Sequence, residues 1–115
     1  MGLDITISTK KHSEDFRKRN FLITWVEKVL DREIDNCETY PLEKEQLESL
    51  LADIDRVLEG NSLAEELLPT REGFFFGDTE YDESYFDDLR DARERIGQMV
   101  ADMEDGETAD FWAWW

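Results

Sequence analysis

The alternation of apolar and polar residues predicts a strand at each end of the chain. Leu3, Ile5 and Ile7 are separated by single polar residues, and this period of two is typical of a half-buried β-strand. At the other end, the segment 109–115 is too aromatic to remain solvated and too short to form a helix on its own. We expect this segment to form a strand beside the N-terminal strand.

A helical spacing of apolar residues follows over much of the chain. Apolar side chains recur three or four positions apart within 21–30, which predicts a first helix over about 13–35. Pro41 interrupts this pattern. Between residues 47 and 58 the apolar side chains again share one face, which predicts a second helix with Gly60 at its C-terminal cap.

The acidic second half of the chain carries the last predicted helix. A short helical turn is expected over 61–67, and a proline follows it. A third helix then begins at Asp82 or Glu83 and ends near Gly106, with its apolar side chains on one face. Its N-terminus is expected to be capped by Asp82 alone or by Thr79 together with Asp82.

Three consecutive phenylalanines, Phe74, Phe75 and Phe76, lie between Gly73 and Gly77. Three such rings would expose a large apolar area, so we expect a tightly turned backbone that packs at least one ring into the core. A short extended segment at this place would add a third strand. The predicted fold is therefore α+β: one compact domain over the whole chain, with three main helices and a small sheet of two or three short strands.

The length of the chain, 115 residues, is enough to bury about two-thirds of the unfolded surface in a single core. Stability therefore requires neither a disulfide nor a metal. Cys37 is the only cysteine and cannot form an internal disulfide. The sequence shows no signal peptide and no apolar segment long enough to cross a bilayer. We expect a cytoplasmic protein.

The charge is strongly negative and unevenly distributed. The chain holds 13 basic and 30 acidic residues, for a net charge of -17. Residues 1–42 contain seven basic and eight acidic residues, whereas residues 43–115 contain six and twenty-two. Affinity for nucleic acid or an anionic membrane comes largely from Lys and Arg, so this composition argues against both. Disorder is also excluded, because 40% of the residues are apolar and their positions are periodic.

Residues able to support catalysis are scarce. His12 is the only histidine and lies in a polar, basic segment, where a solvated side chain is expected rather than a catalytic base. Cys37 is expected to be a packed thiol rather than a nucleophile. The sequence contains no phosphate-binding glycine-rich loop and no zinc-ligand spacing. It therefore predicts a protein that is not an enzyme and needs no cofactor.

A calcium-binding loop is suggested by one alternation of acids but fails on spacing. Asp78, Glu80 and Asp82 alternate like the first three ligands of such a loop. The loop also needs glycine at about its sixth position and glutamate at about its twelfth, where this chain has Glu83 and Leu89. We therefore expect no specific metal site.

One long motif runs through the middle of the chain: Leu-Pro-Thr at 68–70, Gly-Phe-Phe-Phe-Gly at 73–77 and Thr-Glu-Tyr-Asp-Glu at 79–83. Shorter matching segments are Gly-Leu-Asp at 2–4, Arg-Lys-x-Asn at 17–20, Trp25, Asn36-Cys37 and Tyr40. On these residues the chain resembles a family of small acidic proteins found in bacteriophages and prophages. The C-terminal Phe-Trp-Ala-Trp-Trp departs from the family pattern, in which small polar residues separate an aromatic pair from a final Trp. The resemblance implies a shared fold and a viral origin, but no activity.

The acids of the third predicted helix are the candidate binding residues. Glu83, Asp87 and Asp91 recur at a spacing of four, and further acids crowd the C-terminal end, where the helix dipole disfavours negative charge. A chain that keeps several such unfavourable features is expected to use them for a partner, although a merely solubilising surface is the simpler alternative. The predicted partner-binding face consists of Glu80, Asp82, Glu83, Asp87, Asp91, Asp102, Glu104 and Asp105.

The remaining aromatic residues have a structural and an interface interpretation. The structural one places three of them mostly in the core: Tyr81, Tyr85 and Phe86. In the same structural interpretation, the tryptophans of the C-terminal segment cover an edge or a face of the sheet. If part of the tail is exposed, these rings become anchors of an interface, as Trp commonly is, and a homodimer is the simplest result. The candidate interface aromatics are Trp112, Trp114 and Trp115.

The predicted partner is a basic protein surface, with no direct nucleic acid and no membrane. The leading hypothesis is a non-enzymatic phage or prophage accessory protein that mimics nucleic acid. It would inhibit a host defence or nucleic-acid-binding protein, such as a CRISPR or restriction component. The alternative is an acidic structural or regulatory homodimer, and a small metal-dependent enzyme is a third hypothesis.

Overall fold

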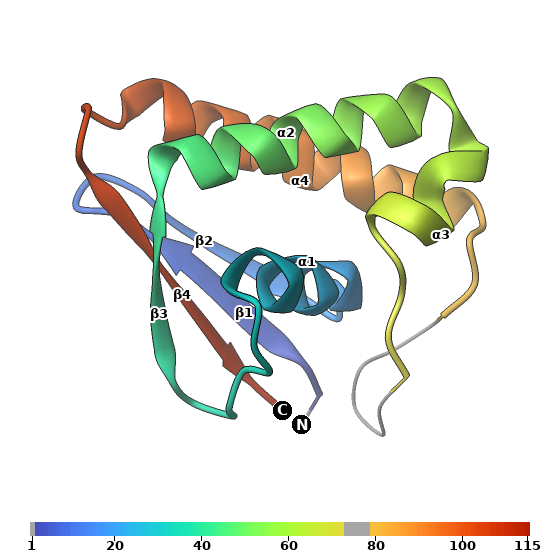
Figure 1. Cartoon of the computed structure of the whole chain (residues 1–115), viewed down its shortest axis with the longest axis horizontal. Coiled ribbons are helices and arrows are strands. Elements are labelled where there is room, and N and C mark those ends of the chain that lie inside the picture. Colours follow the sequence, from blue (N-terminus) through green and yellow to red (C-terminus); the bar gives the residue numbers. More distant parts are fainter. Residues whose placement is uncertain (1, 73–78) are drawn as a thin grey trace.

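The computed structural model describes residues 2–72 and 79–115. Over these residues the chain forms an antiparallel four-stranded sheet whose helices all lie on one side (Figure 1). The prediction of an α+β fold is confirmed, although the sheet has more strands than the two or three expected.

The strand order in the sheet is β2-β1-β4-β3. The central strands are β1, Asp4–Ser8, and β4, Thr108–Trp114, which lie side by side as the sequence predicted and pair antiparallel. Strand β2, Ser13–Arg17, pairs with β1 through a tight hairpin, and β3, Thr39–Glu43, pairs with the other side of β4. The first and last strands of the chain, β1 and β4, therefore form the middle of the sheet. Strands β2 and β3 pair with them and form the edges.

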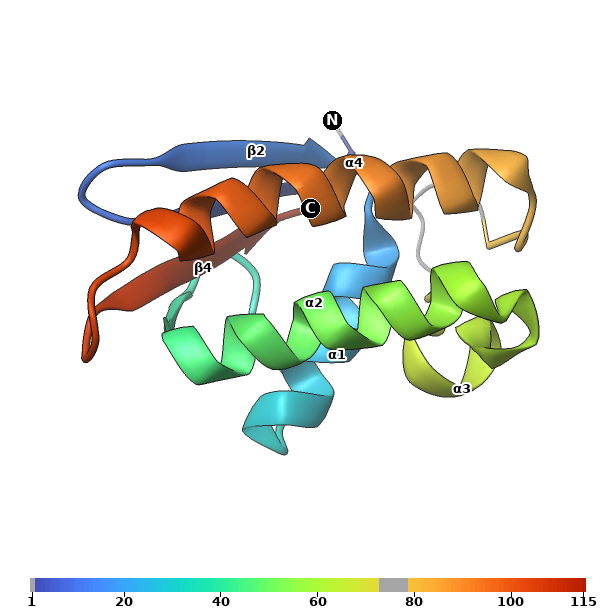
Figure 2. The same ribbon diagram turned by 90° about the horizontal axis from the view of Figure 1, so that it is seen from above.

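The helices form a layer over the sheet. Helices α2, Lys44–Glu59, and α4, Glu83–Asp102, lie side by side and run in opposite directions, and α1, Asn20–Leu30, crosses below them (Figures 1 and 2). A 3₁₀ turn at Asn61–Leu63 leads into the short helix α3, Ala64–Leu67, where a helical turn was predicted. None of the helices in the described part of the chain has the length and apolarity needed to cross a membrane.

The core fills the space between the helices and one face of the sheet. Leu3, Ile5 and Ile7 are completely buried on the helix side, which confirms the alternating pattern of β1. Trp25 of α1 is among the largest side chains packed there. The predicted apolar face of α4 is also buried along its whole length: Tyr85, Leu89, Ala92, Ile96, Met99 and Val100, continued by Met103.

The predicted first helix, over about 13–35, is wrong at both ends. Residues 13–17 form β2 instead, because pairing with β1 and burial of Phe16 outweigh local preference. The backbone of Lys18 then takes a left-handed conformation, and the helix starts only at Asn20. At the other end Asp31, also left-handed, donates its N–H to the carbonyls of the last turn and stops the helix.

Pro41 does more than interrupt a helical pattern, because it lies within β3. Proline has no N–H to donate to a ladder and is tolerated on edge strands. Strand β3 is an edge strand, so the missing N–H of Pro41 weakens the main-chain hydrogen bonding on only one side of one strand. The sequence pattern therefore did not predict β3, which the structure forms.

The caps predicted for the C-terminus of α2 and the N-terminus of α4 are both confirmed. Gly60 is the C-terminal cap of α2, and Asp82 caps α4 by accepting a hydrogen bond from the Tyr85 N–H at 3.1 Å. Helix α4 stops at Asp102, four residues before the predicted end at Gly106, and the chain turns into β4 through Gly106, whose φ of 84° favours glycine.

Several other expectations are corrected or lie outside the described residues. Cys37 is exposed, not packed, because it sits in a left-handed turn ahead of β3. Tyr81 is 36% exposed, whereas Tyr85 is buried as predicted. His12 is not freely solvated but is bonded to Asp102. The predicted extended segment at 73–77 lies outside the described part of the chain.

Both edges of the sheet carry features that oppose further strand pairing. On β2, Arg95 of α4 donates to the Asp15 carbonyl at 2.5 Å and pairs with the Glu14 carboxylate at 2.7 Å. Its guanidinium lies 4.1 Å from the centre of the Phe16 ring. At the other edge, β3 contains Pro41.

Candidate functional site

The eight acids of the predicted partner-binding face do not form one compact patch. One group lies at the N-terminal end of α4 and another follows its C-terminal end, while Asp91 lies between them. A helix of 20 residues is about 30 Å long at 1.5 Å per residue. The structure therefore separates the predicted face into two clusters at opposite ends of the helix.

The N-terminal cluster contains Glu80, Asp82, Glu83 and Asp87. Asp82 is committed to capping the helix, and Asp87 accepts a hydrogen bond from Arg90 at 2.7 Å. Glu83 is exposed in the first turn, where the helix dipole stabilises negative charge, and it has no ion pair among the described residues. Only part of this cluster is thus free to bind a partner.

Asp91 is used inside the molecule. It accepts a hydrogen bond from Arg95 at 2.9 Å, one helical turn away, and lies 3.5 Å from the guanidinium of Arg19. Both arginines hold α4 against β2 and the start of α1. Asp91 is therefore better explained as a structural residue than as part of an exposed acidic stripe.

The C-terminal cluster contains Asp102, Glu104 and Asp105. The Asp102 carboxylate lies 2.5 Å from Nε2 of His12, which joins the end of α4 to the β1–β2 hairpin. Asp105 is fully exposed, with its carboxylate 3.8 Å from the Lys44 ammonium. These contacts offset part of the unfavourable interaction of the acids with the helix C-terminus.

The sequence analysis included Glu83 in its predicted face but did not select the acids of α2 or Glu94 of α4, because it followed one spacing of four along the third predicted helix. Helix α2 directs an outward stripe of glutamates away from the core, and α4 adds two more. Each is exposed and has no ion pair with any described residue. We call this surface the helical face; its members are Glu45, Glu48, Glu59, Glu83 and Glu94. Arg93 and Asp55, 2.8 Å apart, join the two helices beside it.

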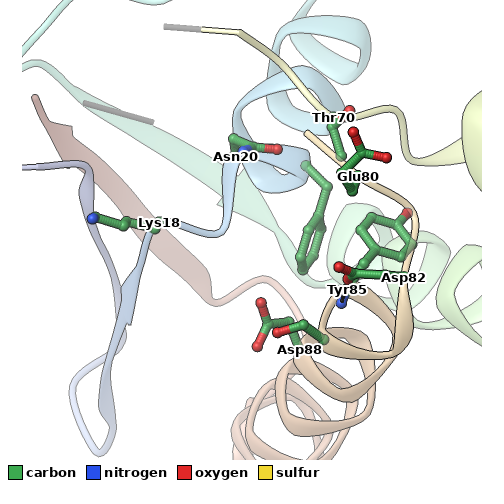
Figure 3. Close-up of a pocket in the computed structure, with 9 residues that line it drawn as sticks. Lys18, Asn20, Thr70, Glu80, Asp82, Tyr85 and Asp88 are labelled. Atoms are coloured by element: carbon green, nitrogen blue, oxygen red, sulfur yellow. Dashed lines mark hydrogen bonds between the residues drawn. The ribbon is translucent and has the colours of Figure 1, made fainter. Parts of the chain in front are cut away.

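A pocket of about 190 Å³ opens where α1 and α4 begin, next to the chain segment around Thr70. Figure 3 shows Glu80, Asp82 and Asp88 on one side of it and Lys18 on the opposite side. The pocket wall also includes Phe21 and Tyr85, whose rings meet edge to face at 5.7 Å. Three carboxylates and one ammonium give this pocket a negative balance, so it suits a cationic group better than an anionic one.

The polar groups of the pocket are held by the fold. The Tyr85 hydroxyl donates to the Leu68 carbonyl at 2.6 Å. Burial raises the pKa of the Tyr85 hydroxyl above its ordinary value, with the nearby Tyr81 adding to the effect. The side-chain oxygen of buried Asn20 accepts from the Arg71 N–H at 3.2 Å. Tyr85 and Asn20 therefore fix the positions of their chain segments.

The pKa of Asp88, one of the acids that line the pocket, is raised by its surroundings. Its partial burial raises the pKa of the carboxyl group, and the Arg19 guanidinium, 3.4 Å away, lowers it. Nearby carboxylates raise it further: Asp91, Asp87 and Asp82. Sequence analysis did not select Asp88, because the spacing of four that it followed runs through the neighbouring Asp87. The signal that could have found it is its place on the inner side of α4, next to the buried Leu89.

The polar groups that line the pocket are three carboxylates, three hydroxyls, one amide and one ammonium. His12 and Cys37 are not among its lining residues. Across residues 2–72 and 79–115, no three or more acidic, histidine or cysteine side chains come close enough to hold a metal ion. The carboxylates, tyrosine hydroxyl and amide that line the pocket can form hydrogen bonds with a bound group.

The three candidate interface tryptophans occupy different environments. Trp112 and Trp114 point away from the helices on β4, and Trp114 is 44% exposed. Trp115 is partly buried against the core and bonded to Asn36. The structure therefore brings Trp112 and Trp114 together on one face and separates Trp115 from them.

Comparison of the chain with protein-family models, with curated proteins and with solved structures found no match. The function is therefore inferred from the residues and their arrangement.

Proposed function

We propose that the protein is a non-enzymatic, acidic binding protein of phage or prophage origin. It presents the helical face to the basic surface of a host nucleic-acid-binding protein and inhibits it by occupying the place of nucleic acid. CRISPR and restriction components are the classes of target we favour, in the host-cell cytoplasm. The observation that carries the proposal is the stripe of exposed glutamates that form no ion pair with any described residue, including Glu48 and Glu94, on two packed helices.

The physical basis of the proposal is the position of the charge. Of the net charge of -17, all but one unit arises after residue 42, and that part of the chain contains α2 and α4. Two antiparallel helices that pack together hold their outward side chains on a rigid surface. Such a surface attracts a basic groove and raises the rate of encounter, as nucleic acid itself does.

The resemblance of residues 68–83 to small phage and prophage proteins supports the viral origin. Inhibition of a host protein by charge mimicry requires no catalytic group, which agrees with the scarcity of such groups in the sequence. It does require that carboxylates remain available. For this reason we assign binding to the helical face rather than to the salt-bridged Asp87, Asp91 and Asp102.

The test compares two variants with the same change in net charge. Glu48→Lys with Glu94→Lys alters the helical face, and Glu33→Lys with Glu38→Lys alters exposed acids in the loop before β3. The parent and both variants are immobilised and exposed to a bacterial lysate, and the retained nucleic-acid-binding proteins are identified and then challenged with duplex DNA.

The proposal expects the helical-face variant to lose the proteins that duplex DNA displaces, and the loop variant to keep them. Retention should fall steeply as salt is raised, because the reach of surface charges shortens from about 10 Å at 0.1 M salt to about 3 Å at 1 M. Equal loss in both variants would show that only net charge matters and that the acids serve solubility.

A further inference from the structure

The side of the sheet that faces away from the helices carries two tryptophans and a set of carboxylates. We call it the open sheet face and define it by Asp4, Asp15, Asp110, Trp112 and Trp114. These residues alternate with buried ones along β1, β2 and β4, so their side chains point away from the helix layer. In Figure 1 no helix or strand of the described part of the chain covers this side of the sheet.

Both tryptophans have smaller side chains as their cross-strand neighbours, and Trp112 is partly buried whereas Trp114 is exposed. The cross-strand neighbours of Trp112 are Thr6 and Thr39, and Trp114 lies opposite Asp4. Trp114 is one of only two large hydrophobic side chains classed as exposed among the described residues. Exposed Trp is unfavourable in water and is enriched where one protein binds another. This pair therefore marks the open sheet face as an interaction surface.

The charges around the rings indicate the chemistry of the occupant. Asp110 lies two residues before Trp112 on the same face of β4, and it has no ion pair among the described residues. Asp15 accepts a hydrogen bond from the Thr6 hydroxyl at 2.7 Å and has no ion pair with any described residue. Asp4 is paired with Arg17 at 3.1 Å. A cation placed over either indole ring would be attracted both by the quadrupole of the ring and by a nearby carboxylate.

Two other occupants fit this surface less well. Nucleic-acid bases stack on exposed aromatic rings, but the binding sites that use such stacking also carry a basic groove for the backbone. Here carboxylates lie in that position. A second copy of the chain would bring together two acidic faces and two net charges of -17, which repel each other.

We propose that the open sheet face binds an extended, arginine-bearing segment of a basic protein. Trp112 and Trp114 are two residues apart on one strand, so their side chains are about 7 Å apart, as are alternate side chains of an extended peptide. Two arginines separated by one residue can therefore stack on the two rings at once. Arginine fits better than lysine because its planar guanidinium stacks on aromatic faces. This site is on the opposite side of the molecule from the helical face and is independent of it.

The test uses a capped peptide, Arg-Thr-Arg-Thr-Arg, and its lysine counterpart, titrated into ¹⁵N-labelled protein. The chain has four tryptophans, and each gives an indole N–H signal. The signals of Trp112 and Trp114 should shift and saturate with the arginine peptide, while that of Trp25, which is 1% exposed, should stay in place. The lysine peptide should bind more weakly.

Charge-neutral variants separate a specific site from general attraction to an acidic protein. Trp114→Ala and Trp112→Ala each leave the net charge unchanged and should weaken peptide binding about fivefold or more. Asp110→Asn should also weaken it. The matched control is Glu48→Gln on the helical face, which removes the same charge as Asp110→Asn. It should change the affinity by less than about twofold at 0.15 M salt, where the screening length is about 8 Å.

Three results would overturn the inference. The first is an unchanged affinity for the arginine peptide in both tryptophan variants, with melting curves showing that they are folded. The second is a shift of the Trp112 and Trp114 signals with protein concentration alone, which would identify a second copy as the occupant. The third is saturable binding of a single-stranded thymine oligonucleotide at the same two rings. Loss of the helical-face function alone would leave this inference standing.

Discussion

The side-chain amide of Asn36 exchanges two hydrogen bonds with the main chain of Trp115. It donates to the Trp115 carbonyl at 2.8 Å and accepts from the Trp115 N–H at 2.9 Å. The neighbouring Cys37 N–H donates to the Ala113 carbonyl at 2.8 Å. One side chain thus continues the β3–β4 ladder past the last strand pair and fixes the segment that follows the exposed Trp114.

Removing this amide should loosen the end of β4. We expect Asn36→Ala to lower the free energy of unfolding by about 1 to 2 kcal/mol, since two hydrogen bonds worth about 1 kcal/mol each are lost. Chemical denaturation and hydrogen exchange of the Trp115 amide provide the measurement. Glu38→Ala, in the same exposed loop, is the control and should cost less than about 0.5 kcal/mol. Unchanged exchange in Asn36→Ala would contradict the prediction.

The buried Tyr85 hydroxyl predicts a loss of stability in alkali. Because burial raises its pKa in the folded state above the ordinary 10.0, the unfolded chain releases this proton first as the pH increases. The contribution of the hydroxyl is therefore complete below about pH 10 and declines above it. Tyr85→Phe should be destabilised by about 1 kcal/mol or more at pH 8, because the Leu68 carbonyl loses its donor.

Denaturation curves between pH 8 and pH 11 test the linkage of Tyr85. The decline of the parent above pH 10 should be shallower in Tyr85→Phe. Tyr40→Phe is the comparison for loss of a different hydroxyl, which accepts from the Asp35 N–H at 2.7 Å. Parallel curves for parent and Tyr85→Phe would show that this tyrosine is not the source of the decline.

Asp88 should destabilise the fold when it is ionised. Its pKa is raised in the folded protein, mainly by burial, so its contribution is favourable below the unfolded pKa, about 3.9, and is lost as the pH rises through the folded value. Asp88→Asn should therefore be more stable than the parent at pH 7, and this advantage should shrink toward pH 4. Melting curves across this range measure it. A variant less stable than the parent at pH 7 would mean that the Arg19 contact outweighs the burial.

Arg95 should contribute more to stability than the exposed Arg90 of the same helix. It bonds Glu14, Asp91 and the Asp15 carbonyl and stacks on Phe16. We expect Arg95→Ala to lower the free energy of unfolding by about 2 kcal/mol, and Arg95→Lys to restore only part of it because lysine lacks the planar fork. The control is Arg90→Ala, whose exposed pair with Asp87 should be worth less than about 1 kcal/mol. Equal effects of the two alanine variants in urea denaturation would contradict this prediction.

The protein should not bind DNA or RNA. The excess of acids after residue 42 repels a phosphate backbone over most of the surface. A gel-shift assay at low salt, where any electrostatic attraction is strongest, should show no complex with duplex DNA or with single-stranded RNA. A salt-sensitive complex at micromolar protein would refute it.

The central strands and the two long helices could be predicted because their patterns are local. Alternation in β1, and apolar stripes in α2 and α4, each reveal one buried face within a single segment. Strand β2 has the sequence SEDFR, with one buried apolar residue, Phe16, so its own pattern contains little to distinguish it. It forms because β1 and Arg95, 81 positions from Glu14, are present to pair with it. Such contacts have no signature within five residues.

The same reason limits prediction of the site. The spacing of four along α4 correctly indicated which carboxylates share a side of the helix. It did not show that Arg19, 72 positions away, would reach Asp91, or that His12 would bind Asp102. Trp112 and Trp114 were recognised as candidate interface residues from composition. Their separation from Trp115 depends on the alternation of β4 and on the bond from Asn36.

The closed edges of the sheet determine how this molecule can meet others of its kind. Arg95 bonds the Asp15 carbonyl of β2, and Pro41 removes a donor from β3. Another strand would therefore meet an occupied carbonyl on one edge and a missing donor on the other, which disfavours growth of the sheet from molecule to molecule. The strands are therefore expected to remain within single molecules, and the exposed ring of Trp114 stays available for reversible contacts.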